Sequence, residues 1–166
     1  MSPLDSDGRD RMVSFFSDLI RSIEANGGGP EVAGLGAEEI ESVRVDQHIE
    51  SLPMYYEEFL RNMGRCAGQF LIGTDAFYPE MIGIKHDALE LLAENGASHL
   101  IAENAIVFAM HQGYQVYWLE PSGSDDPPVA MYQEGSAELH TRWDSFSEFL
   151  ADQSSRDLAL AARNDD

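Results

Sequence analysis

Two apolar runs around a short turn constrain the fold of this 166-residue chain more than any other feature. Residues 105–110 and 114–119 bracket the tripeptide His111-Gln112-Gly113, and both runs are apolar at nearly every position. Short apolar runs that are joined by a glycine-containing turn predict a β-hairpin. Because both faces of each run are apolar, we expect this hairpin to lie at the centre of its sheet.

A second hairpin is predicted for residues 129–133 and 137–143, with its turn at residues 134–135. In its second strand, Ala137, Leu139, Thr141 and Trp143 alternate with polar residues, which indicates one buried and one solvated face. The apolar runs 69–73 and 77–84 are interrupted by glycine and proline, and they predict further short strands and a loop.

The remaining segments have helical periodicity. Residues 10–25 place Met12, Phe16, Leu19 and Ile23 on one face. Further helices are predicted for residues 37–48 with Ile40 and Val43 inward, for 53–64, for 87–95, and after residue 145. The order of helices, strands with one inserted helix, and a final helix predicts an α+β fold rather than a parallel sheet.

Several residues are expected to begin or end these helices. Gly64 is expected to cap the third helix, and Asp87 to begin the fourth, in which Leu89 and Leu92 are expected to be buried. Ser145 and Glu148 have the spacing of a capping box.

Three regions are expected along the chain. Residues 1–30 form an N-terminal helical extension that ends in a glycine-rich joint at 27–30, because consecutive glycines are costly to order. Residues 31–152 form the α+β domain, and residues 153–166 form a polar C-terminal tail that frays or continues as a poorly packed helix.

The charge balance limits the classes of partner. Ten Lys and Arg face thirty Asp and Glu, so the formal net charge is −20. Such a surface disfavours nucleic acids and anionic membranes, whose phosphates require cations. It favours a basic protein partner, or it serves solubility alone. The polar, acidic start and the lack of a long apolar stretch predict a cytoplasmic protein. The single cysteine, Cys66, fits a reducing compartment.

No motif predicts catalysis or a cofactor. The five histidines are scattered, and one cysteine cannot complete a zinc site with them. Asp125 and Asp126 are followed by two prolines, which departs from a calcium-binding loop. The glycines at 27–29 are not followed by the Lys-Ser/Thr of a phosphate-binding loop. We therefore expect no metal, no cofactor and no enzymatic activity. A small hydrolase or metal enzyme, with a site assembled from distant residues, stays open as a less favoured alternative.

The middle of the chain resembles a known family. The resemblance begins with Leu52, Pro53, Tyr56, Phe59, Leu60 and Gly64, continues with the segment 73–79, the hairpin at 108–114 and the segment 126–129, and ends with Tyr132, Trp143 and the segment 145–150. Over residues 35–152 this pattern is similar to the SUKH superfamily, which includes a fungal cell-wall synthesis regulator of the Smi/Knr type and bacterial immunity proteins.

The resemblance implies a curved, mostly antiparallel sheet with flanking helices, and it implies neither a cofactor nor catalytic residues. It implies an immunity protein that neutralises a cognate toxin by direct binding, or alternatively a regulatory protein-interaction module. Polar and amphipathic residues at turns and strand ends are the binding candidates, since loops carry recognition more often than cores. They are Asp75, Tyr78, Gln112, Tyr114, Asp125 and Asp126. We hypothesise one acidic surface on which Tyr78 and Tyr114 anchor a basic toxin.

Overall fold

The computed structural model describes residues 5–27 and 31–164. In this part of the chain, one antiparallel sheet has the strand order β1-β2-β3-β4-β5. The strands are β1 (Thr74–Asp75), β2 (Ile106–His111), β3 (Gln115–Leu119), β4 (Val129–Gln133) and β5 (Thr141–Trp143). The α-helices are α1 (Ser6–Asn26), α2 (Ala37–Asp46), α3 (Met54–Met63), α4 (Ile84–Glu94) and α5 (Phe146–Asn164). The predicted α+β class is confirmed.

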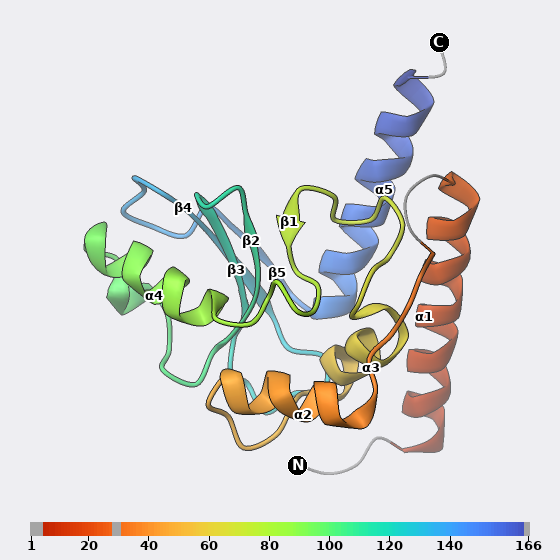
Figure 1. Cartoon of the computed structure of the whole chain (residues 1–166), viewed down its shortest axis with the longest axis horizontal. Coiled ribbons are helices and arrows are strands. Elements are labelled where there is room, and N and C mark those ends of the chain that lie inside the picture. Colours follow the sequence, from red (N-terminus) through yellow and green to blue (C-terminus); the bar gives the residue numbers. More distant parts are fainter. Residues whose placement is uncertain (1–4, 28–30, 165–166) are drawn as a thin grey trace.

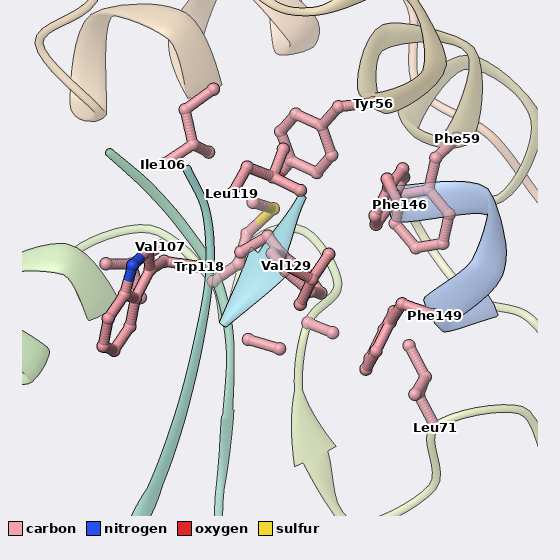
Figure 2. Close-up of a cluster of buried hydrophobic side chains, with 14 of the residues drawn as sticks. Tyr56, Phe59, Leu71, Ile106, Val107, Trp118, Leu119, Val129, Phe146 and Phe149 are labelled. Atoms are coloured by element: carbon pink, nitrogen blue, oxygen red, sulfur yellow. The ribbon is translucent and has the colours of Figure 1, made fainter. Parts of the chain in front are cut away.

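The helices cover the sheet on both faces. Helix α4 lies on one face, while α3 and α5 lie on the other, and α1 packs on the outside of α3 and α5 (Figure 1). Val107 and Trp118 point to the α4 side, and Val129, Phe146 and Phe149 lie on the opposite side (Figure 2). The hydrophobic core is therefore divided into two layers by the sheet.

The predicted central hairpin is confirmed. Strand β2 lies between β1 and β3, and β3 lies between β2 and β4. Gln112 and Gly113 form the turn with φ angles of 50° and 75°, the left-handed conformation that tight hairpin turns require. The pairing of β2 with β3 shifts between Val107 and Ala109, which marks a β-bulge.

The buried side chain of Gln47 forms hydrogen bonds with the main chain of β2 beside this bulge. The Gln47 side chain is fully buried, its Nε2 donates to the Val107 carbonyl at 2.7 Å, and its Oε1 accepts from the Val107 N–H at 3.0 Å. Lys85 Nζ donates to the carbonyl oxygens of Gln47 at 2.8 Å and Glu103 at 3.1 Å. The Gln47 bonds connect the end of α2 to the sheet and satisfy both main-chain groups of Val107, which need partners because they are buried. The Lys85 bonds connect the start of α4 to Gln47 and to the loop before β2.

Two glycines allow α3 to pack closely against its neighbours. Gly64 ends α3 as predicted, but its φ of −67° is right-handed. A Cβ at this position would lie 2.6 Å from the Leu60 oxygen and 2.8 Å from the Leu35 side chain. A Cβ at Gly34 would overlap the Arg61 carbonyl. Both glycines are therefore required by close approach rather than by a left-handed conformation.

The predicted strands at 69–73 and 77–84 are wrong. Turns occupy most of both segments, and the sheet receives only the two residues of β1. Gly68, Leu71 and Gly73 have positive φ angles of 59°, 55° and 77°, so the chain cannot stay extended there. These turns place Ile72 on the surface, where its side chain is 67% exposed.

Helix α4 begins three residues before its predicted start. Gly83, with a φ of 91°, is its N-cap, and the Gly83 N–H donates to Asp46 Oδ2 at 3.2 Å. Asp87 therefore does not begin the helix. Leu92 is buried as predicted, whereas Leu89 is 39% exposed.

The second hairpin is shorter than predicted. Strand β4 matches its predicted range, but β5 contains only Thr141–Trp143. Ser136 Oγ accepts from the Glu138 N–H at 3.3 Å and donates to the Glu138 carbonyl at 2.8 Å, so a side-chain turn replaces the start of the strand. Ala137 is consequently exposed, while Trp143 is buried.

The final helix begins with the predicted cap. Ser145 Oγ accepts from the Glu148 N–H at 3.1 Å, and the Glu148 carboxylate accepts from the Asp144 N–H at 3.0 Å. Phe146 and Phe149 are buried as predicted. The helix continues to Asn164, so the described part of the predicted tail is helical.

Helix α1 buries the predicted stripe within this molecule. Met12, Phe16, Leu19 and Ile23 are buried, and α1 packs against α3 and α5. Asp5 caps α1 by accepting from the Gly8 N–H at 2.6 Å, so the helix starts earlier than predicted. Residues 28–30 of the predicted joint lie outside the described residues.

Candidate functional site

Three of the six predicted binding residues gather at one end of the sheet, which we call the turn end because it carries the β2–β3 turn. Gln112 is exposed in this turn, and Tyr114 follows it with its ring edge against His111 at a centroid distance of 6.0 Å. Asp75 is exposed in the adjacent strand β1, whose Thr74 pairs with His111. The sheet register therefore brings together residues that are nearly 40 positions apart.

Asp125 and Asp126 lie at the opposite end of the sheet. Their loop connects Leu119 of β3 to Val129 of β4, and Leu119 pairs with Ile106 at the start of β2. The rise of about 3.3 Å per residue separates the two ends of β2 by roughly 17 Å. The structure therefore does not gather all six candidates on one small surface.

Asp126 has a structural role. Its carboxylate accepts from the Ser147 N–H at 2.9 Å and from Ser147 Oγ at 2.5 Å, and this anchors the loop to the first turn of α5. Burial raises the pKa of Asp126, although the Ser147 hydrogen bonds act in the opposite direction. The Asp125 carbonyl accepts from the Tyr55 N–H at 3.0 Å. Recognition by Asp126 would have to compete with this anchoring.

Tyr78 lies beside the end of α3. Its N–H donates to the Gly64 carbonyl at 2.8 Å, and the Arg65 guanidinium lies 5.8 Å from the centre of its half-buried ring. This cation–π contact holds the ring against the protein. Arg65 also pairs with Glu39. Tyr78 therefore belongs to a local cluster in which its aromatic face is already occupied.

A cleft opens at the turn end, on the sheet face that α5 covers. We call it the turn cleft; its volume is about 260 Å³. The loop before β1 forms one wall, β2 and β3 form the floor, and α5 forms the other wall. The lining residues are Leu71, Ile72, Thr74, Ala109, His111, Gln115, Tyr117, Phe149, Gln153, Asp157 and Leu160.

Two exposed aliphatic side chains and one acid stand out in the mixed polar and apolar lining of the turn cleft. Ile72 is 67% exposed and Leu160 is 57% exposed, so both side chains present aliphatic surface to solvent. Asp157 Oδ2 is shielded from water and has no hydrogen-bond partner among the residues that the structure describes. Burial raises the pKa of Asp157, and hydrogen bonding by the Leu71 backbone acts in the opposite direction. A cleft that combines exposed aliphatic surface with a single acid is suited to binding a cationic side chain.

A second hollow of about 360 Å³ lies at the opposite end of the sheet. Residues 48–53 and the loop at 119–124 form most of its lining, together with Asn104, Ile106 and Pro127. Predicted candidates Asp125 and Asp126 flank this hollow in sequence without lining it. Its walls come mainly from loops and contain both polar and apolar residues.

Sequence reasoning missed the α5 wall of the turn cleft. Asp157 and Leu160 lie in the segment that was expected to be a polar tail, and Ile72 lies in a predicted strand. The only available signal was the recurrence of residues 149, 153, 157 and 160 at helical spacing beyond the predicted end of the final helix.

The described residues contain no group of three or more His, Cys, Asp or Glu side chains arranged to hold a metal ion. Across residues 5–27 and 31–164, no helix is both long and apolar enough to cross a membrane. The family model described as SMI1 / KNR4 family (SUKH-1) matches residues 34–152.

The chain belongs to the SUKH-1 family. The match includes all five strands and helices α2, α3 and α4, and it ends within α5. Helix α1 and the part of α5 after Asp152 therefore lie outside the SUKH-1 match. No curated protein matches the chain significantly. The turn cleft is thus formed jointly by the SUKH-1 sheet and by a helical wall beyond the matched region.

Proposed function

We propose that this chain is a cytoplasmic, non-enzymatic immunity protein that neutralises a bacterial toxin by binding it directly. The observation that carries the proposal is a net charge of −20 on a SUKH-1 domain. Such a charge raises the encounter rate with a basic protein and repels nucleic acids. A toxin with a basic domain, such as a nuclease, is a partner with the complementary charge.

The few cations of the chain offset this charge only locally. Lys85 is buried, and within the described residues six arginines form ion pairs with carboxylates: Arg21, Arg44, Arg61, Arg65, Arg142 and Arg156. The remaining carboxylates therefore determine the field that an approaching protein meets. Exposed charges of this kind steer association and add little to the strength of the final complex.

The test is co-expression with a candidate toxin domain, chosen from the genes that neighbour the gene of this chain. Cells that produce the toxin domain should grow only when the chain is also produced, and the two purified proteins should form a stable complex. The association rate should fall as the ionic strength rises from 0.01 M to 0.1 M, since the Debye length shrinks from about 30 Å to about 10 Å.

Failure of protection with a correctly folded chain would refute the immunity role. If the chain instead captured a regulatory protein of its own cell and gave no protection, the regulatory role implied by the family would replace it. An association rate independent of salt would refute the electrostatic part of the proposal.

A further inference from the structure

We propose that the turn cleft binds one lysine or arginine side chain from a basic segment of the protein partner. The cationic group would pair with Asp157, and the aliphatic stem would lie against Ile72 and Leu160. The inference rests on the proposed function in one respect, namely that the natural partner is a basic protein.

The dimensions of the cleft favour a side chain. Its volume of about 260 Å³ is below the roughly 300–1,000 Å³ of pockets that enclose drug-sized ligands. Lysine and arginine combine a long apolar stem with a charged end, and they bury the stem along apolar surface. Exposed Ile72 and Leu160 supply that surface on opposite walls.

The charge of the cleft favours a cation. Asp157 Oδ2 is shielded from water and lacks a hydrogen-bond partner among the residues described. A shielded carboxylate oxygen without a partner costs free energy in the folded protein, and pairing with a cation would remove that cost. The neighbouring Arg156 does not supply it, because its guanidinium pairs with Asp152 at 3.2 Å.

Polar side chains on the sheet side of the cleft have partners within the molecule. Thr74 Oγ1 lies 3.0 Å from His111 Nδ1, and the Tyr117 hydroxyl donates to Gln115 Oε1 at 3.3 Å. On the helix side the polar lining residues are Gln153 and Asp157. Of these two, Asp157 carries the charge that a cationic ligand would complete.

The electrostatics of the whole chain argue against other occupants. Phosphate-bearing ligands would meet a net charge of −20. A second copy of this chain would have to supply a free cation, yet most of its arginines are paired with carboxylates and Lys85 is buried. A basic segment of another protein is the occupant with complementary charge.

One wall of the site lies outside the family-matched region. Gln153, Asp157 and Leu160 lie beyond residue 152, where the SUKH-1 match ends. One wall of the cleft is therefore formed by residues outside the matched domain, which fits a site that selects a particular partner.

The experiment uses two short peptides and the full-length chain. The probes are acetyl-Leu-Lys-Leu-amide and its norleucine counterpart, which keeps the aliphatic stem and lacks the ammonium group. Two-dimensional amide NMR spectra are recorded during titration with each peptide. We expect saturable shifts at Ile72, Thr74 and Gln153 with the lysine peptide, and about tenfold weaker binding of the norleucine peptide.

Variants then identify the responsible groups. Asp157→Asn should weaken binding of the lysine peptide about tenfold, because a charge-assisted hydrogen bond is lost. Asp10→Asn, which removes the same charge from an exposed position on α1, should leave the affinity unchanged. Ile72→Ser should weaken both peptides several-fold without affecting folding, since Ile72 is 67% exposed.

Equal affinity for the two peptides, or native affinity in folded Asp157→Asn, would overturn the cation site. Equal shifts with spermidine would also overturn it, because they would show attraction of any polycation to an acidic protein. Native affinity of Ile72→Ser would overturn the role of the apolar wall.

These measurements need no toxin. If the lysine peptide binds as expected while the chain fails to protect cells, the proposed function is refuted and the proposal of a cation site in the turn cleft is supported. If Asp157→Asn leaves peptide binding unchanged while the native chain protects cells, the cleft is refuted and the immunity role stands.

Discussion

Replacing Gln47 with leucine should destabilise the fold strongly, although leucine is apolar and similar in size. The Gln47 amide pairs with both the N–H and the carbonyl of Val107, at 3.0 Å and 2.7 Å, and the side chain is fully buried. In Gln47→Leu both main-chain groups stay buried and lose their partner. At about 1–3 kcal/mol for each unsatisfied group, the free energy of unfolding should fall by about 2–6 kcal/mol.

Equilibrium unfolding in urea measures this loss, and two further variants separate its causes. Gln47→Glu keeps the shape but replaces the donor to the Val107 carbonyl with a charged acceptor, so it should also lower stability. Gln69→Leu makes the same chemical change at an exposed position and should alter stability by less than about 0.5 kcal/mol. A loss below about 1 kcal/mol in Gln47→Leu would refute the reasoning.

Three other substitutions test single features of the fold by the same unfolding measurement. Tyr56→Phe should leave stability unchanged or raise it by up to about 1 kcal/mol, because the buried Tyr56 hydroxyl has no hydrogen-bond partner among the described residues; a loss above about 1 kcal/mol would contradict this. Gly34→Ala should cost at least about 2 kcal/mol, because its Cβ would overlap the Arg61 carbonyl; near-native stability would be the contrary result. Burial lowers the pKa of Lys85 below its ordinary value of 10.5, so the unfolded chain retains this proton over a pH range in which the folded chain has released it. The contribution of Lys85 to the free energy of unfolding therefore rises as the pH approaches 10.5. Over that range the native chain should become more stable relative to Lys85→Met; a difference in stability that stays constant with pH would contradict this.

The hydrophobic pattern predicted those elements for which the periodicity and the turn or cap residues indicate the same structure. The central hairpin was predictable because its turn residues and its two apolar faces point to the same structure. The stripe on α1 and the cap at Ser145 were predictable for the same reason, since periodicity and helix-end chemistry are local properties.

The segment at 69–84 was not predictable from its apolar pattern. Its apolar residues suggest strands, but the positive φ angles of Leu71 and Gly73 turn the chain before a strand can form. A non-glycine residue in this conformation carries no distinctive sequence signal. Ile72 is exposed as a result of this turn.

The candidate site was less predictable than the fold, because a site depends on which distant segments meet. The sequence indicated Asp75, Gln112 and Tyr114 as loop residues, and the sheet register brings them to the turn end. It could not show that Asp126 is engaged by Ser147, since that contact spans 21 residues. Charged loop residues are thus weak predictors of recognition until their local partners are known.

The position of Asp157 depends on helix α1 as well as on α5. Ile23 and Asn26, at the end of α1, line a small space of about 10 Å³ that Asp157 also borders. Phe16 and Leu19 are buried where α1 packs on α3 and α5, so α1 supports α5 on the side away from the sheet (Figure 1). Both helical segments lie outside the family match, at opposite ends of the chain. Because α1 packs against α5, it helps to fix the position of α5 and therefore of Asp157 at the turn cleft.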